Sequence, residues 1–279
     1  MSCLSMVVSD LDGTILQDGR RISTFDLDTL REIGEKGIIR VIATGRSLYS
    51  ARAVLQDDFP VDYLIFSSGA GIVGWREKRL LMKQSLTPDE VKTIVKLLLV
   101  LKCDFMVHDP VPYNHFFTYY TSHRDNPDFE RRRILYSEFA TELDIASYRY
   151  REACQIIAIE PNAYGGSMAT RVRQLLPGLK VIRTTSPLDR QSVWIEIFPS
   201  GVSKASASDW ICRKHGINGE CVLGIGNDYN DLDLLSWAHT GILVGDAPEE
   251  LKSMFVAVGE KNGFSEAVSL WLGQRNAGR

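Results

Sequence analysis

The chain lacks the features that mark membrane proteins and nucleic-acid-binding proteins. Its longest apolar stretch, Leu97 to Leu101, is far shorter than the roughly 20 residues that a membrane-spanning helix needs. The formal net charge of the 279 residues is only −3, and the dense blocks of Lys and Arg that nucleic-acid binding requires are missing. We therefore expect no membrane partner and no nucleic-acid partner.

The cysteines and histidines show none of the spacings that build disulfide frameworks or metal centres. The five cysteines are odd in number and include no Cys-x-x-Cys pair, so buried free thiols are expected. His108, His115 and His123 lack an established metal-ligand spacing and are expected to be structural or solvent-exposed. Asp10 interrupts the apolar start of the chain, so no secretory signal is visible and a cytoplasmic location is expected.

The N-terminal segment combines a short apolar run with a pair of acids. Residues 4–8 predict a buried strand that ends at Asp10 and Asp12, and Gly13 and Thr14 follow. Ligands of open α/β sheets bind beyond the carboxyl ends of the strands, so two carboxylates at this place suggest chemistry. Asp and Gly are also ordinary turn formers, and the pair alone does not decide between a turn and a site.

The next residues predict a β-α-β unit. Ser23 is placed to cap a helix whose apolar residues recur at helical spacing, and Gly37 ends it. A strand over 38–43 follows, which implies a right-handed crossover and two parallel strands. The segment Thr44-Gly45-Arg46 then falls where this second strand ends, on the same rim as Asp10 and Asp12. Gly69 to Gly74 fits a dinucleotide fingerprint, but a hairpin is predicted there because no helix follows.

The C-terminal part again alternates strands and helices. Residues 193–197 alternate as a strand does and are expected to resume the core, and Lys204 opens a helix running to about 214. A strand over 221–225 ends at a loop with the sequence Gly226-Asn227-Asp228-Tyr229-Asn230-Asp231. Strand-helix alternation on both sides of the middle region favours a doubly wound core built from both chain ends.

Four stretches resemble the motifs of the haloacid dehalogenase (HAD) superfamily, in the expected order. They are Asp10-Leu11-Asp12-Gly13-Thr14, Thr44-Gly45-Arg46, Gly201-Val202-Ser203-Lys204 and Gly226 to Asp231. Their spacing is similar to the Cof-type branch, which carries a large cap between the second and third motifs. The resemblance implies an α/β fold with a doubly wound, Rossmann-like parallel-sheet core over 1–84 and 191–279. An inserted α/β cap domain, which chooses the substrate, would occupy 85–190.

The resemblance also implies a role for each motif. Asp10 would be the nucleophile that forms an aspartyl-phosphate, and Asp12 would protonate the leaving group and later deprotonate water. Thr44, Gly45, Arg46 and Lys204 would bind the phosphorylated substrate, with Thr44 and Lys204 also serving catalysis. An anionic nucleophile attacking an anionic phosphate needs countercharge, which Mg²⁺ held by hard oxygen ligands can supply. The expected metal residues are Asp10, Asp12, Asn227, Asp228 and Asp231.

The fourth motif leaves one metal ligand open. The commoner family pattern is Gly-Asp-x-x-Asn-Asp, and aligning Asn230-Asp231 with it puts Asn227 where the first metal-binding acid is expected. An Asn oxygen can ligate Mg²⁺ without adding negative charge. Asp231 would then supply more of the negative charge at the metal, directly or through water. A shifted loop would make Asp228 the ligand instead. We prefer Asn227 with Asp231 and keep Asp228 as the alternative.

The resemblance predicts a Mg²⁺-dependent phosphatase for a small phosphorylated metabolite such as a sugar phosphate. The same intermediate could serve a phosphotransferase or phosphomutase, and a non-catalytic binding protein that retains the fold is a third possibility. The basic run Arg131 to Arg133 is expected to be a solvated helix face, although in a cap it could also meet an anionic substrate. A monomer or small homo-oligomer is expected.

Overall fold

The computed structural model describes residues 4–17, 21–122 and 125–277. The described chain divides into two compact units, which we call the core unit and the inserted unit. The core unit comprises residues 1–46, 50–82 and 203–279, and the inserted unit comprises 47–49 and 83–202, as far as these ranges are described. Among the described residues, no helix combines the length and the apolar character needed to cross a membrane.

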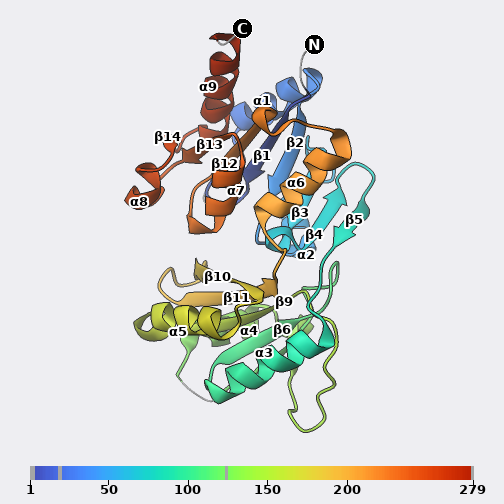
Figure 1. Cartoon of the computed structure of the whole chain (residues 1–279), viewed down its shortest axis with the longest axis vertical. Coiled ribbons are helices and arrows are strands. Elements are labelled where there is room, and N and C mark those ends of the chain that lie inside the picture. The colour runs from blue at the N-terminus through green and yellow to red at the C-terminus, as the bar shows by residue number, and fades with distance from the viewer. Residues whose placement is uncertain (1–3, 18–20, 123–124, 278–279) are drawn as a thin grey trace. The chain divides into compact units, whose positions relative to one another are not determined.

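The core unit is built on an eight-stranded sheet with the order β14-β13-β12-β1-β2-β3-β4-β5 (Figure 1). The contacts from β14 through β3 are parallel, and β4 returns antiparallel to β3. The strands are β1 (Met6–Asp10), β2 (Ile39–Ala43), β3 (Tyr63–Phe66), β4 (Gly71–Gly74), β5 (Arg79–Lys83), β12 (Val222–Gly226), β13 (Thr240–Val244) and β14 (Val256–Val258). The predicted α/β core with a parallel sheet is confirmed, and its far edge is the predicted hairpin of β4 and β5.

Helices cover both faces of this sheet. The helices of the core unit are α1 (Thr24–Glu35), α6 (Lys204–His215), α7 (Leu232–Trp237), α8 (Glu249–Lys252) and α9 (Gly263–Ala277), and α2 (Leu48–Arg52) is divided between the two units. Helices α6 and α7 bury apolar side chains against β1, β2 and β12 on one face, while α1 and α9 contact each other and the sheet on the opposite face. The side chain of Ser23 accepts a hydrogen bond from the Asp26 amide, as the sequence predicts for the start of α1.

The inserted unit has its own six-stranded sheet, with the order β10-β11-β9-β6-β7-β8. Its strands are β6 (Asp104–His108), β7 (Phe117–Tyr120), β8 (Ala140–Glu142), β9 (Gln155–Glu160), β10 (Leu179–Thr185) and β11 (Val193–Pro199). Helices α3 (Pro88–Val100) and α5 (Asn162–Leu175) share an apolar core on one face, and α4 (Pro127–Leu135) packs on the other. Thr87 and Glu90 form the predicted capping box of α3.

Strand β11 corrects the predicted domain boundary. Residues 193–197 were expected to resume the core, but β11 pairs antiparallel with both β9 and β10 in the sheet of the inserted unit. The turn that joins β10 to β11 is fixed by the Asp189 carboxylate, which accepts hydrogen bonds from the amides of Gln191 and Ser192. The core unit therefore resumes at Ser203, not at 191, because this hairpin keeps the chain in the second sheet.

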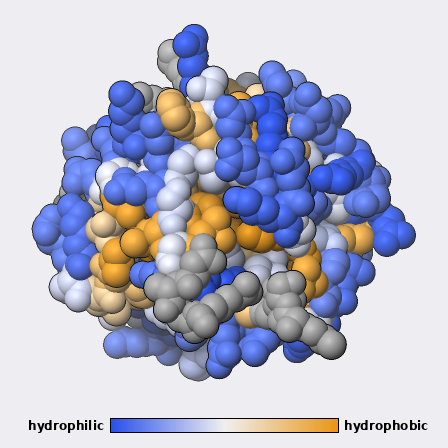
Figure 2. All heavy atoms as spheres, turned by 90° about the horizontal axis from the view of Figure 1, so that it is seen from above, coloured by the Kyte–Doolittle hydropathy of each residue, from blue (hydrophilic) through white to orange (hydrophobic). Residues whose placement is uncertain are grey.

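Polar and thiol side chains follow the expectations with one exception. Cys103, Cys154 and Cys212 are buried and form no disulfide, whereas Cys221 is disulfide-bonded, contrary to expectation. Cys3 and His123 lie outside the described residues. On the face seen in Figure 2, hydrophilic side chains form most of the described surface and surround a hydrophobic area near its centre.

The buried ring of His108 makes a specific prediction about acid stability. Burial and the charge of Arg132 lower the pKa of His108 to about 3, whereas in an unfolded chain it is near 6.5. Below pH 6.5 His108 therefore binds a proton in the unfolded state but not in the native state. The free energy of unfolding falls for this reason as the pH decreases from 6.5 towards 3. His108 should contribute a loss of on the order of 1.5 kcal/mol between pH 6.5 and 5.

The measurement is urea unfolding of wild type and His108→Asn across that pH range. The variant should be less stable at pH 7, because a packed ring is lost, but its stability should fall less steeply with acid. Parallel pH dependences for the two proteins would contradict the prediction.

Candidate active site

The carboxyl ends of three adjacent parallel strands bring the first, second and fourth motifs together. Asp10 is the last residue of β1, Thr44 follows β2 directly, and Asn227 follows β12 directly. Strand β1 lies between β12 and β2, with Asp10 in register with Ala43 and Ser9 in register with Ile225. The polar residues that follow these strands therefore lie at one edge of the sheet, where open α/β sheets bind ligands.

The loop after β1 turns sharply at Gly13. This glycine has a φ of +76°, and a Cβ atom placed on it would overlap the side chain of Asn227. The turn is closed by hydrogen bonds from the Gly13 amide to the Leu16 carbonyl and from the Leu16 amide to the Leu11 carbonyl. Glycine is needed here both for its backbone conformation and for the close approach of the loop after β12.

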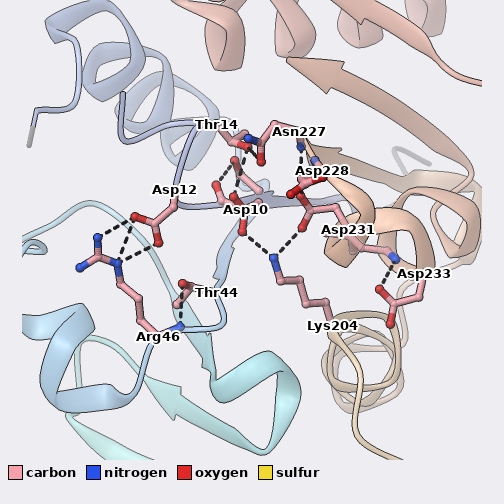
Figure 3. A network of polar contacts seen from close by, with 12 residues as sticks. Asp10, Asp12, Thr14, Thr44, Arg46, Lys204, Asn227, Asp228, Asp231 and Asp233 are labelled. Carbon is pink, nitrogen blue, oxygen red and sulfur yellow. Dashed lines mark hydrogen bonds and ion pairs between the residues drawn. The ribbon is translucent and has the colours of Figure 1, made fainter. Parts of the chain in front are cut away.

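The buried ammonium group of Lys204 joins two carboxylates from different motifs (Figure 3). Its Nζ lies 2.5 Å from Oδ1 of Asp10 and 2.5 Å from Oδ1 of Asp231. Lys204 is the first residue of α6, whose start is fixed by a capping box between Ser203 and Ser206. All three charged side chains are at most 5% exposed, so the charges are held away from bulk water.

The fourth motif folds around Asp231. Oδ2 of Asp231 accepts hydrogen bonds from the backbone amides of Asn227 at 3.0 Å and Asp228 at 3.3 Å. Asp228 directs Oδ1 to the amide of Tyr229 and so caps the short 3₁₀ helix over Tyr229–Asp231. Asp231 thus orders the loop with one oxygen and contacts Lys204 with the other.

Thr14 links Asn227 to Asp10. Its hydroxyl lies 3.2 Å from Oδ2 of Asp10 and 3.3 Å from Oδ1 of Asn227, and its side chain is fully buried. Sequence reasoning assigned no functional role to Thr14, although it is the last residue of the first motif. The contact with Asn227 spans 213 positions in sequence and carries no local signal.

Asp12 and Arg46 form a separate ion pair. The Nη2 atom of Arg46 lies 2.6 Å from Oδ1 of Asp12, and Nε lies 2.8 Å from Oδ2. The guanidinium therefore donates hydrogen bonds to both carboxylate oxygens. The Asp12 side chain is 44% exposed, so its carboxylate remains open to solvent. The buried hydroxyl of Thr44 accepts a hydrogen bond from the Arg46 amide at 3.1 Å, and Gly45 between them is exposed.

Burial makes the electrostatics of the lysine cluster unusual. Desolvation and the nearby Asp231 raise the pKa of Asp10 to about 7, although the Lys204 charge opposes this shift. The two carboxylates raise the pKa of Lys204 despite its burial, so the ammonium stays charged. Burial also raises the pKa of Asp228. Two carboxylates around one ammonium leave a net negative charge that a further cation would neutralise.

A family model described as haloacid dehalogenase-like hydrolase matches residues 7–272. The chain belongs to this family. The resemblance carried by the four motifs is thereby confirmed, and the match spans both units and the described site residues.

Individual relatives of this HAD-like hydrolase are distant but nearly full-length. It is 25% identical over 256 residues to YxeH of Bacillus subtilis (strain 168), whose name gives phosphatase as its assumed activity, covering 89% of this chain and 90% of that protein. The 5-amino-6-(5-phospho-D-ribitylamino)uracil phosphatase YcsE of the same organism is 22% identical, covering 96% of both chains. The structure of BT4131, a HAD subclass IIB sugar phosphatase, superposes with a TM-score of 0.76 at 20% identity, covering 96% of this chain and 98% of the other.

The oxygen donors of this HAD-like hydrolase fit a small hard cation. A metal site built only from His, Cys, Asp and Glu side chains would need at least three of them close together. The described parts of the chain contain no such group. Asp10 Oδ2 and Asn227 Oδ1 nevertheless converge on one hydroxyl, that of Thr14, and both are oxygen ligands of the kind that Mg²⁺ takes. Both Asp231 oxygens are already engaged, so Asp231 could reach a cation there only through water or by leaving Lys204.

Removing the lysine charge should destabilise the core unit. In Lys204→Met, two buried carboxylates lose their shared countercharge, and breaking a buried pair in this way costs about 3–5 kcal/mol of unfolding free energy. Urea unfolding at pH 8 measures the loss, with the exposed Lys214→Met on the same helix as control, expected within about 0.5 kcal/mol of wild type. Equal stability of the two variants would show that Lys204 is not a structural countercharge.

Proposed function

We propose that this HAD-like hydrolase is a Mg²⁺-dependent phosphatase that hydrolyses small phosphorylated metabolites, sugar phosphates in particular, through an aspartyl-phosphate on Asp10. The observation that carries the proposal is the buried Lys204 ammonium held between Asp10 and Asp231 at the carboxyl edge of the sheet. It supplies positive charge beside a carboxylate at the place where α/β sheets bind ligands. Two relatives support the substrate class: BT4131 is a sugar phosphatase, and YcsE is a phosphatase of a phosphoribityl compound.

The first step forms a bond between a carboxylate oxygen of Asp10 and phosphorus, while the bond from phosphorus to the leaving oxygen breaks. Lys204 would hold Asp10 in place and offset the charge that gathers on the phosphoryl oxygens. The hydroxyl of Thr44 and the backbone amides of this rim, including that of Gly45, are the neutral donors we assign to those oxygens. Asp12 would give a proton to the leaving oxygen, which departs as an alcohol.

The second step is hydrolysis of the acyl phosphate. A water molecule attacks phosphorus and gives its proton to Asp12, and the bond between phosphorus and Asp10 breaks to release inorganic phosphate. Both roles of Asp12 need a carboxyl group that is open to substrate and fixed in direction. The Asp12 side chain is partly exposed, so substrate can reach it. The two hydrogen bonds from Arg46 fix its direction. In this proposal Arg46 positions Asp12 and can also contact bound phosphate.

Mg²⁺ would be held by Asp10, the Asp12 backbone carbonyl and Asn227, with Asp231 reached through water. When bound, it would supply the second positive charge that an anionic nucleophile and an anionic phosphate require. The structure favours Asn227 over Asp228 in this set, because Asn227 shares the Thr14 hydroxyl with Asp10 whereas Asp228 caps the following 3₁₀ helix.

The proposed reaction predicts metal-dependent phosphate release that depends on Asp10. Wild type should release phosphate from members of a panel of phosphorylated sugars, nucleotides and cofactors with Mg²⁺ and not with EDTA. Asp10→Asn should lose at least about 10³-fold in kcat, since the amide is a poor nucleophile. Asp233→Asn is the matched control, because this acid lies two residues beyond the motif, in α7, and accepts a hydrogen bond from the Leu234 amide.

Other outcomes of this assay would contradict the proposal. Transfer of phosphate to an added sugar phosphate, with little free phosphate, would indicate a phosphotransferase or mutase. Turnover that survives in Asp10→Asn would exclude Asp10 as the nucleophile. No reaction with any compound, in a chain that binds phosphorylated ligands, would indicate a binding protein.

The choice of Asn227 as a metal ligand predicts different responses to two side-chain changes. Asn227→Leu removes an oxygen at nearly constant size and should raise the Mg²⁺ concentration for half-maximal activity by about 10-fold or more. Asp228→Asn keeps the cap on the Tyr229 amide and should change that concentration less than threefold. The reverse order, measured by Mg²⁺ titration of phosphate release, would make Asp228 the ligand.

A further inference from the structure

The turn between β3 and β4 holds three consecutive residues in left-handed backbone conformations. Ser67 has a φ of +50°, Ser68 a φ of +55° and Gly69 a φ of +108°. Residues other than glycine rarely adopt such angles, so holding Ser67 and Ser68 there costs free energy. Both serines are buried, at 0% and 6% exposure. We call Ser67, Ser68 and Gly69 the serine turn.

The hairpin connection alone does not require this conformation. Phe66 of β3 pairs with Gly71 of β4, so residues 67–70 join the two strands. Connections of this length are most often built around a type I turn, whose central residues have negative φ. The left-handed angles of the serine turn therefore need a reason other than the reversal of the chain.

The amides of the serine turn bind the backbone of the second motif. The Ser68 amide donates a hydrogen bond to the carbonyl oxygen of Thr44 at 3.0 Å. The Ser67 amide donates to the carbonyl oxygen of Arg46 at 2.8 Å. Two successive amides thus fix the two carbonyl groups on either side of Gly45.

These hydrogen bonds orient the amide of Gly45. In a trans peptide unit the carbonyl group and the following N–H point in opposite directions. The Thr44 carbonyl points to the turn after β3, so the Gly45 N–H points away from β3. Strand β2 lies between β1 and β3, so this direction is towards β1, which ends at Asp10. Gly45 is exposed, so its amide is open to a ligand.

The third residue of the serine turn lies against the start of α6. A Cβ atom placed on Gly69 would overlap the carbonyl oxygen of Ser203, the residue that caps α6. Lys204 is the next residue, so the backbone that carries it packs directly on the turn. The serine turn therefore contacts both the second and the third motif, and all of these residues belong to the core unit.

We propose that the serine turn is a positioning element that directs the Gly45 amide towards the phosphoryl group transferred to Asp10. The proposal rests on the phosphatase function proposed above and deepens it, because it assigns the placement of a backbone donor to residues outside the four motifs. A donor that is already in place needs no reorganisation when charge develops in the transition state. It lowers the barrier to reaction rather than only tightening substrate binding.

Two substitutions of Ser68 separate the backbone conformation from the side-chain hydroxyl. Ser68→Thr keeps the hydroxyl but is β-branched, which disfavours positive φ, whereas Ser68→Gly lacks the hydroxyl and accepts positive φ readily. With 4-nitrophenyl phosphate and with the best sugar phosphate, Ser68→Thr should lose about 10-fold or more in kcat, while KM changes less than about threefold. The kcat of Ser68→Gly should exceed that of Ser68→Thr by about 10-fold.

Asn262→Thr is the matched control. Asn262 also has a left-handed φ, of +58°, but it lies in the loop before α9, outside the four motifs. Its variant should lose stability in urea as Ser68→Thr does, yet keep kcat within about threefold of wild type. The inhibition constant of orthovanadate, which mimics the phosphoryl group during transfer, should rise about 10-fold or more in Ser68→Thr alone.

Three outcomes would overturn the proposal. The first is an unchanged kcat in Ser68→Thr, and the second is an equal loss of kcat in Asn262→Thr, which would indicate general strain. The third is a Ser68→Gly enzyme as slow as Ser68→Thr. In that case the hydroxyl of Ser68 would be the active group, since it lies 3.5 Å from where a Cβ atom of Gly45 would be.

Wild type alone decides the question if Ser68→Thr does not fold. With ¹⁵N-labelled glycine in the protein, the amide signal of Gly45 should shift when orthovanadate and Mg²⁺ are added. A signal that does not move overturns the proposal.

Failure of the phosphatase function would look different, because wild type would then release no phosphate from any ester. Inorganic phosphate titrated into the labelled protein with Mg²⁺ still tests the serine turn in that case. A Gly45 amide signal that moves in wild type, with an affinity about 10-fold weaker in Ser68→Thr, supports the proposal. A signal that does not move, or equal affinities, overturns it.

Discussion

The ion pairs of Lys204 are the constraint on which the core unit depends. Burying an ammonium group with two carboxylates removes three charges from water, which costs free energy. The buried group is stable only when attraction between these charges at close range offsets that cost. Here the partners come from the first, third and fourth motifs, and Lys204 and Asp10 are 194 positions apart. The cluster therefore forms only when chain segments on both sides of the inserted unit have folded onto one sheet. Stability and the capacity for chemistry rest on the same three side chains.

The charge balance of this cluster is the physical reason for proposing a further cation. Lys204 cancels only one of two negative charges, and burial raises the pKa of Asp10 to about 7. A carboxylate in that state is a reluctant nucleophile towards a phosphate dianion. A further cation would both favour the ionised form of Asp10 and reduce its repulsion from substrate, which is the physical argument for metal dependence. The second carboxylate of the first motif, that of Asp12, is bonded to Arg46 instead of Lys204 and is partly exposed to solvent.

Local sequence signals predicted the elements and the rim of the site. Apolar runs that end in acids gave β1 and β12, and the caps at Ser23 and Thr87 fixed the starts of α1 and α3. Strand β11 was assigned to the wrong sheet, since alternation shows that a segment is a strand but not which strands it joins. The register with β9 and β10 follows from a hairpin turn and from packing, neither of which has a period in the sequence.

Side-chain partnerships were the least predictable part, because they join residues far apart in the chain. The ion pair of Arg46 with Asp12 and the contact of Thr14 with Asn227 both depend on tertiary register.

A single sequence therefore identifies candidate catalytic residues better than residues that recognise a substrate. The proposed phosphoryl transfer uses residues at strand ends and at the start of one helix, and those residues form contiguous motifs. A recognition surface on a sheet uses every second residue of several strands, and these fall among apolar neighbours that look like core. In the inserted unit His108 and Gln155 sit at the ends of buried strands, where a sequence reading assigns packing. Only the cross-strand register shows that their side chains share one face of the sheet, and neither strand carries that register in its own sequence.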